Sequence, residues 1–151
     1  MIQRKQTLFI LLAVVFTVAC LCRPIAAVEP QGMGLQTVIW NFGIVTSHGP
    51  AFFGSWPLFV LLTVTVPMQL CAVFLYRKRM LQAKLCTLSA VLCFVWCTCY
   101  AFEAFNTFGL QGTFHPRFAA CLPLVAAISL LLARQGIIHD EKLVRAADRI
   151  R

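Results

Sequence analysis

Four long stretches of this chain contain no charged residue, and they constrain its fold more than any other feature. The clearest runs from Trp56 to Tyr76 and is followed by Arg77, Lys78 and Arg79. A helix of roughly 20 apolar residues spans a bilayer core, and aromatic and basic residues gather where such a helix leaves it. The other three uncharged stretches are 6–22, 85–102 and 118–133. The pattern predicts an all-α membrane protein, an antiparallel bundle of four transmembrane helices at about 6–23, 56–76, 84–103 and 117–138.

The composition excludes an ordinary soluble domain. Of the 151 residues, 60% are hydrophobic and 12% are charged, whereas a soluble domain is about half apolar and about a quarter charged. A soluble enzyme is therefore excluded. Four crossings of roughly 20 residues each leave too few residues for a second folded unit, so we expect one transmembrane domain over 1–151.

The first uncharged stretch has two interpretations. It follows Arg4 and Lys5 and precedes the small residues Ile25-Ala26-Ala27. A basic start, an apolar middle and small residues at the end are also the features of a cleaved secretory signal. We expect the stretch to be retained as the first helix, with cleavage as the alternative.

The basic residues are distributed unevenly between the two sides of the predicted bundle. If both termini lie on one side, that side holds all but two of the 13 Lys and Arg residues, and the other side holds only Arg23 and Arg117. Basic residues near the ends of crossings face the cytoplasm, so we expect both termini to be cytoplasmic. Four of these residues are expected to set the topology and to contact anionic headgroups: Arg77, Lys78, Arg79 and Lys84. This distribution accounts for the net charge of +8 without a nucleic-acid partner.

The two outer connections have an unusual composition. The first, 24–55, contains several glycines around the β-favouring residues 37–42, which predicts a short strand or hairpin. The second, 103–117, contains Phe105, Phe108 and Phe114. These aromatic residues either occupy the headgroup zone, or the two connections together form a small ordered cap. We expect Glu103 to form an ion pair with Arg117 or Arg23.

The tail after Ile138 has the pattern of a short helix at about 139–151. Apolar residues recur at helical spacing from Leu143 to Ile150, and Glu141 and Arg145 form a favourable i, i+4 pair. This helix either continues the fourth crossing, lies along the inner membrane surface or docks onto a protein. The residues expected to bind a protein partner are Asp140, Glu141, Lys142, Leu143, Arg145, Asp148 and Arg149.

Both ends of the chain resemble one known family. Residues 1–8 read MIQRKQTL and residues 140–151 read DEKLVRAADRIR. They resemble small bacterial integral-membrane proteins classified only as a domain of unknown function, whose members begin M-[IL]-Q-R-x-Q-[TS] and end D-E-K-L-V-R-S-A-D-R-[LI]-R. Ala146 stands where the family usually has Ser. The resemblance covers essentially the whole chain and implies a four-helix protein of the bacterial inner membrane, but it implies no reaction.

The chain contains 8 cysteines and no Cys-x-x-Cys pair. Small polarisable thiols allow helices to pack closely, and this is the role we expect for them. Five of them fall in the outer halves of the predicted helices, nearest an oxidising compartment: Cys20, Cys22, Cys97, Cys99 and Cys121. A membrane thiol or quinone oxidoreductase is therefore the alternative.

One polar residue falls inside the second predicted crossing. Gln69 follows Pro67, whose missing N–H leaves the carbonyl of Thr63 without its helical partner. This arrangement indicates either a kink needed for packing or a polar notch for a transported substrate. A small transporter would need an oligomer to enclose a pathway, and the oligomeric state stays open.

We expect an accessory, assembly or scaffolding subunit of a larger membrane complex. The tail is distinctive, and no phosphate loop, nucleophile elbow or H-E-x-x-H motif occurs in the sequence. We therefore assign no catalytic, cofactor-binding or metal-binding residue and no cofactor. The expected partners are the lipid bilayer, with anionic headgroups at the cytoplasmic face, and other membrane proteins.

Overall fold

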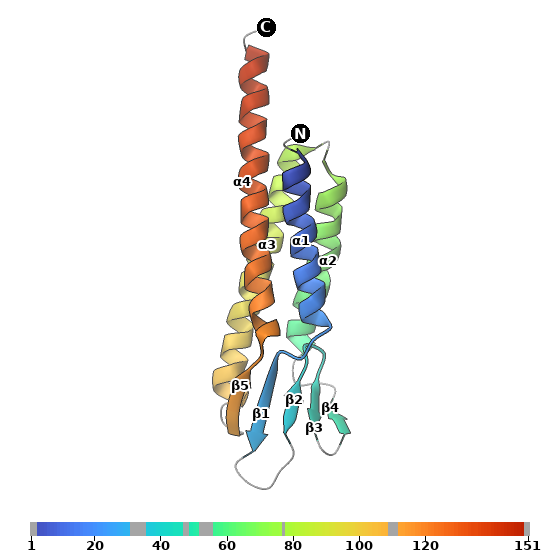
Figure 1. Cartoon of the computed structure of the whole chain (residues 1–151), viewed down its shortest axis with the longest axis vertical. Helices are drawn as coiled ribbons and strands as arrows, with labels where there is room; N and C mark the ends of the chain where they lie inside the picture. Colours follow the sequence, from blue (N-terminus) through green and yellow to red (C-terminus); the bar gives the residue numbers. More distant parts are fainter. Residues whose placement is uncertain are drawn as a thin grey trace.

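The computed structural model of the chain describes residues 3–30, 36–46, 49–51, 56–76, 78–108 and 112–149. Four helices run side by side along the long axis (Figure 1): α1 (Gln3–Leu21), α2 (Trp56–Phe74), α3 (Arg79–Glu103) and α4 (Leu122–Arg149). A π-helical turn (η1, Ala104–Phe108) extends α3, and a 3-10 turn (η2, Phe118–Cys121) precedes α4. Both chain ends lie at the same end of the bundle, opposite the strands (Figure 1).

Each helix packs against two neighbours. α4 contacts α1 and α3, and α2 contacts the same two helices from the other side. Small residues line these contacts, including Ala13 of α1, Ala90 of α3 and Ala126 of α4, all of which are fully buried. Small side chains let helix backbones approach closely where lipid offers no hydrophobic drive to association. Cys86 and Cys93 are buried in the same interior, where they fill the space of small apolar residues.

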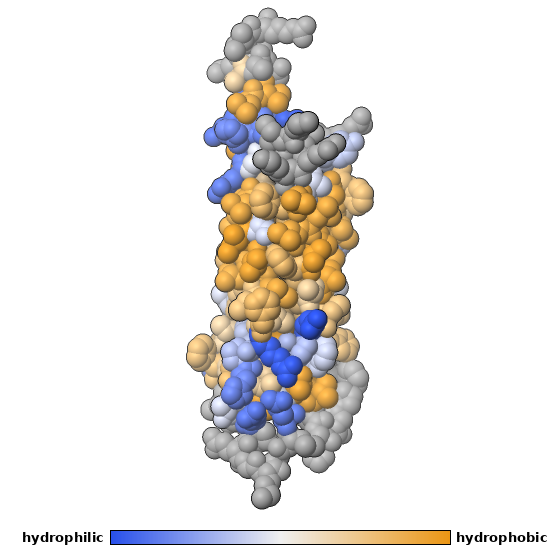
Figure 2. Space-filling view, viewed as in Figure 1, coloured by the Kyte–Doolittle hydropathy of each residue, from blue (hydrophilic) through white to orange (hydrophobic). Residues whose placement is uncertain are grey.

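The outside of the bundle is apolar. Exposed leucine, valine, phenylalanine and isoleucine side chains project from all four helices, for example Val15, Val60, Val91 and Ile128. Figure 2 shows an apolar band across the middle of the face in view, with hydrophilic residues toward its ends. Such an apolar surface is far too extensive for a water-soluble monomer, and it suits contact with the hydrocarbon chains of lipids.

Three helical segments are long and apolar enough to cross a bilayer: Trp56–Phe74, Arg79–Asn106 and Phe118–Val144. A shorter apolar helix covers Gln6–Leu21. The chain is therefore a multi-pass membrane protein. That α1 is a fourth crossing stays a prediction.

A small antiparallel sheet covers the end of the bundle that lies away from the termini. The first connection supplies β1 (Ala26–Pro30), β2 (Thr37–Ile39), β3 (Ile44–Thr46) and β4 (Gly49–Ala51), and the second supplies β5 (Gly112–Pro116). The described strands are ordered β4-β3-β2-β1-β5, with Ala26 opposite Pro116 and Val28 opposite Phe114. The predicted β element is confirmed, and the two connections form one cap.

Two helices begin a few residues from the predicted starts of their crossings. α4 begins at Leu122, because the chain is still extended in β5 up to Pro116 and enters through η2, and its apolar span begins at Phe118. α3 begins at Arg79, and Gln82 and Ala83 are buried parts of it.

The tail is also not a separate helix. α4 continues without a break to Arg149, so of the three arrangements considered for the tail, continuation of the fourth crossing is the one observed. No proline interrupts 124–149, and Ile137 and Asp140 remain packed against the bundle. Ile150 and Arg151 lie outside the described residues.

Candidate functional site

The end of α4 reaches well beyond the other three helices (Figure 1). α4 has 28 residues, which corresponds to about 42 Å at 1.5 Å per residue. Leu143 and Val144, on this projecting part, are 52% and 43% exposed. Figure 2 shows apolar surface on this part too, separated from the central band by hydrophilic residues. We call residues 141–149 the α4 extension.

A groove lies between the base of the α4 extension and the turn from α2 to α3. It has a volume of about 400 Å³ and is lined by Lys78, Arg79, Met80, Leu81, Glu141 and Val144. Two cations, one carboxylate and three apolar side chains therefore line the groove at the termini end of the bundle. The groove suits a segment that carries both apolar and acidic residues.

The predicted partner-binding residues occupy different environments. Lys142 and Leu143 are exposed, and Glu141 lines the groove. Asp140, in contrast, is only 9% exposed and faces the bundle. The side chains of Arg145, Asp148 and Arg149 lie outside the described part of the structure. Partner binding by any of the seven stays a prediction.

Asp140 is held by a residue of α1. The side-chain amide of Gln6, which is 8% exposed, donates a hydrogen bond to Asp140 Oδ2. Gly136, one turn earlier on α4, leaves the room that Gln6 occupies, because a Cβ there would lie 3.1 Å from Gln6 Cγ. Gln6, Gly136 and Asp140 therefore fasten α1 to α4 directly below the α4 extension.

The predicted lipid-contacting residues lie at the same end. Lys78 and Lys84 are exposed and Arg79 is half-buried, whereas Arg77 lies outside the described residues. Their positions suit contact with headgroups, and that contact stays a prediction.

Buried polar side chains also occur farther from the termini, in the interior of the bundle. Thr17 of α1 donates to Gln69 Oε1 of α2 over 3.0 Å, and both side chains are fully buried. Gln69 Nε2 and Ser89 Oγ are buried without a hydrogen-bond partner among the described residues. Gln69 thus joins α1 to α2 through this hydrogen bond, and whether it serves packing or a polar notch stays open.

At the other end, the cap is tied to the bundle through Asn41. Its side-chain amide donates to the carbonyl of Cys20 over 2.7 Å, and its Oδ1 accepts from Trp96 Nε1 over 3.2 Å. Trp96 stacks on Tyr100, with ring centroids 5.3 Å apart. The Tyr100 hydroxyl donates to the carbonyl of Ile25, which leads into β1.

All eight cysteines are free thiols. Cys20, Cys97 and Cys121, from three different segments, lie near enough to influence one another electrostatically. No group of three metal-ligating side chains with suitable geometry occurs in the described residues. The thiol oxidoreductase alternative would have to use these three cysteines, of which Cys20 is buried, Cys97 is half-buried and Cys121 is exposed.

Sequence reasoning missed Gln6, Gly136, Asn41 and Trp96. Gln6 falls within the opening motif shared with the resembling family, which was the available signal for it. Asn41 carried no signal of its own, because its contacts join residues far apart in the chain.

The chain matches the protein family described as "Domain of unknown function (DUF4293)" over residues 2–150. The match covers nearly the whole chain, and it confirms the family resemblance drawn from the two ends. No curated protein matches the chain.

Proposed function

The chain belongs to this DUF4293 family, and we propose that it is an accessory subunit of a larger membrane complex. In this proposal it lies in the bacterial inner membrane with both termini in the cytoplasm. The α4 extension and its groove bind an amphipathic, acidic segment of the partner protein. The observation that carries the proposal is the exposure of Leu143 and Val144 directly after the polar residues 139–142 of α4.

The projecting apolar side chains need a partner for a physical reason. Lipid covers most of the apolar surface of the bundle, but Leu143 and Val144 are exposed directly after the polar residues 139–142 of α4. Burial of such side chains against a protein is favourable by roughly 1.5–3 kcal/mol each. A helix that presents adjacent apolar positions is a common element of peptide recognition.

Charge supports the chemistry assigned to the partner. Lys78 and Arg79 line the groove, and Lys142 is exposed on the α4 extension. In the proposed orientation these cations face the cytoplasm, in keeping with the positive-inside rule. Acidic residues at the edge of the bound segment would complement them, which favours specificity and association rate.

We further propose that α1 is the fourth crossing. It lies in the bundle beside α2 and α4, and its exposed positions Leu8, Leu11 and Val15 are apolar. A fourth crossing also agrees with both chain ends lying at one end of the bundle (Figure 1).

The direct test is photo-crosslinking in membranes. A photoreactive amino acid at position 143 should yield one dominant crosslinked protein, and the same group at Phe74, on the lipid-facing side, should not. The double substitution Leu143→Ser and Val144→Ser should prevent co-purification of that protein, whereas Ala146→Ser on the same extension should leave it unchanged. Equal co-purification with all variants, or crosslinks to lipid alone, would contradict the proposal.

A further inference from the structure

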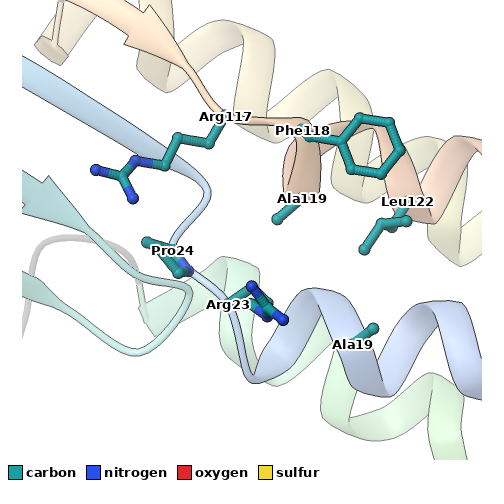
Figure 3. Close-up of a pocket in the computed structure, with 7 residues that line it drawn as sticks. All are labelled: Ala19, Arg23, Pro24, Arg117, Phe118, Ala119 and Leu122. Carbon is teal, nitrogen blue, oxygen red and sulfur yellow. The ribbon is translucent and has the colours of Figure 1, made fainter.

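A second pocket lies at the opposite end of the bundle, between the end of α1 and the start of α4. It has a volume of about 510 Å³ and is lined by Ala19, Arg23, Pro24, Arg117, Phe118, Ala119 and Leu122. In Figure 3, Ala19 projects from α1 toward Ala119 and Leu122 on the facing η2–α4 segment. We call the surface formed by Ala19, Ala119 and Leu122 the apolar seam. Phe118 is 80% exposed and lies at its outer side.

The polar part of the pocket consists of two arginines from different connections. Arg23 follows α1 and Arg117 follows β5, and Figure 3 shows their side chains on either side of Pro24. Both side chains are exposed, and the expected ion pair of Glu103 with one of these arginines stays a prediction. Glu29, the acidic residue of β1, lies 3.8 Å from His115.

The cap fixes the backbone from which these arginines project. The Arg117 N–H donates to the carbonyl of Ile25 over 3.0 Å, and the pairing of Ala26 with Pro116 holds β1 beside β5. The β1–β5 pairing therefore holds the backbones of Arg23 and Arg117 at the rim of one pocket, with their side chains on opposite sides of Pro24 (Figure 3). Arginines that only extend from the membrane interface toward water would not need β1 and β5 to pair beside them.

The arginines are also unusual in their position. They are the two basic residues, out of 13 Lys and Arg, that the sequence places away from the termini end of the bundle. Basic residues there oppose the charge bias that orients a membrane protein, which indicates a use other than topology. Arginine binds phosphate through two parallel, charge-assisted hydrogen bonds.

We infer that this pocket binds the phosphate headgroup of an anionic membrane lipid. Arg23 and Arg117 contact the phosphate, and the lipid chain lies along the apolar seam formed by Ala19, Ala119 and Leu122. The two halves of the pocket, cationic and apolar, match the two halves of such a lipid. The inference needs only the membrane bundle and is independent of the partner proposed for the α4 extension.

The test is native mass spectrometry of the purified full chain in an uncharged detergent, titrated with three probes. Phosphatidylglycerol carries both halves of the ligand, diacylglycerol carries only the chains, and inorganic phosphate carries only the anion. We expect phosphatidylglycerol to bind at least roughly tenfold more tightly than diacylglycerol, the factor that about 1.4 kcal/mol of charge-assisted bonding gives. Inorganic phosphate at the same concentration should not displace it.

Variants locate the site. Arg23→Gln with Arg117→Gln should weaken phosphatidylglycerol binding at least roughly tenfold, and the double lysine variant should restore part of it. Lys84→Gln, which removes an exposed cation at the other end of the bundle, should leave binding unchanged. Ala19→Trp keeps both arginines but fills the seam, and it should also abolish lipid binding. Circular dichroism and gel filtration check that each variant is folded.

Three results would overturn the inference. Equal binding of diacylglycerol would show that the arginines contribute nothing. Displacement by inorganic phosphate at equal concentration would show a site for a free anion rather than a lipid. Equal losses in the Lys84 and the double arginine variants would show attraction to the overall positive charge rather than a pocket. If the double glutamine variant does not fold, the Ala19→Trp variant decides the question alone.

Discussion

At the scale of single residues, the contact between Gln6 and Asp140 has the largest expected consequence. The carboxylate is buried and accepts the amide hydrogen bond, and removal of the donor leaves it uncompensated. Gln6→Leu should therefore destabilise the protein by roughly 1–3 kcal/mol, measured by thermal unfolding in detergent. Gln135→Leu, at an exposed glutamine of α4, is the matched control. The double variant Gln6→Leu, Asp140→Leu should recover part of the loss, and a further drop would contradict this account.

Gly136 is the steric counterpart of the same contact. A Cβ at this position would lie 3.1 Å from Gln6 Cγ, and Gln6 is held in place by Asp140. Gly136→Leu should thus separate α1 from α4 and lower the unfolding temperature, although leucine has the higher helix propensity. Ala146→Leu, at an exposed position of the same helix, should not lower it. An unfolding temperature that rises in both variants would show that propensity outweighs the contact.

Asn41 makes the corresponding contact in the cap. Asn41→Ala removes the donor to the Cys20 carbonyl and the acceptor for Trp96, and both groups are buried. We expect a loss of roughly 1–3 kcal/mol. Asn106→Ala, at an exposed residue that also donates to a backbone carbonyl, should cost much less. Equal unfolding temperatures for the two variants would mean that the cap does not stabilise the bundle.

At the scale of the elements, α4 packs against the bundle and, in our proposal, binds the partner through the α4 extension. Truncations can separate these two roles. Removal of residues 141–151 leaves Ile137 and Asp140 in their contacts, so the unfolding temperature should change little while co-purification of the partner is lost. Removal of residues 134–151 deletes those contacts and should also destabilise the bundle. A large loss of stability in the shorter truncation would place the α4 extension within the folded core instead.

The helices were predictable from sequence because an uncharged stretch of bilayer length satisfies its backbone polar groups in lipid by forming a helix. The partners of the strands were not, since Val28 pairs with Phe114 and no local pattern specifies a pairing over such a separation. Asp140 shows a different limit. The buried face of α4 contains Ala126, Leu130, Ala133 and Ile137, and the same spacing reaches Asp140. The sequence left continuation of the fourth crossing as one of three arrangements for the tail, so it did not predict that Asp140 is buried.

For both pockets described above, the sequence identified lining residues but not that they lie together. Lys78, Arg79 and Glu141 were identified from sequence as residues of the termini end, but their common groove depends on α4 continuing straight past the α2–α3 turn. Arg23 and Arg117 were assigned to one side of the membrane, yet their place in one pocket depends on the β1–β5 pairing.

At the scale of the whole molecule, the cysteines distinguish a packed bundle from a redox enzyme. Cys86 and Cys93 are buried in the core and all eight thiols are free. We expect alkylation before and after mild oxidation of native membranes to give the same labelling, with a single species on a non-reducing gel. A reversible disulfide that joins two of Cys20, Cys97 and Cys121 would instead favour the oxidoreductase alternative.

The account as a whole depends on four crossings that bring both chain ends to the cytoplasm, where the α4 extension meets its partner. Fusion of a fluorescent protein or of a periplasm-dependent phosphatase after Arg151 tests this most directly in living cells. We predict a fluorescent fusion and an inactive phosphatase. An active phosphatase with a dark fluorescent fusion would place the α4 extension on the far side of the membrane and contradict the account.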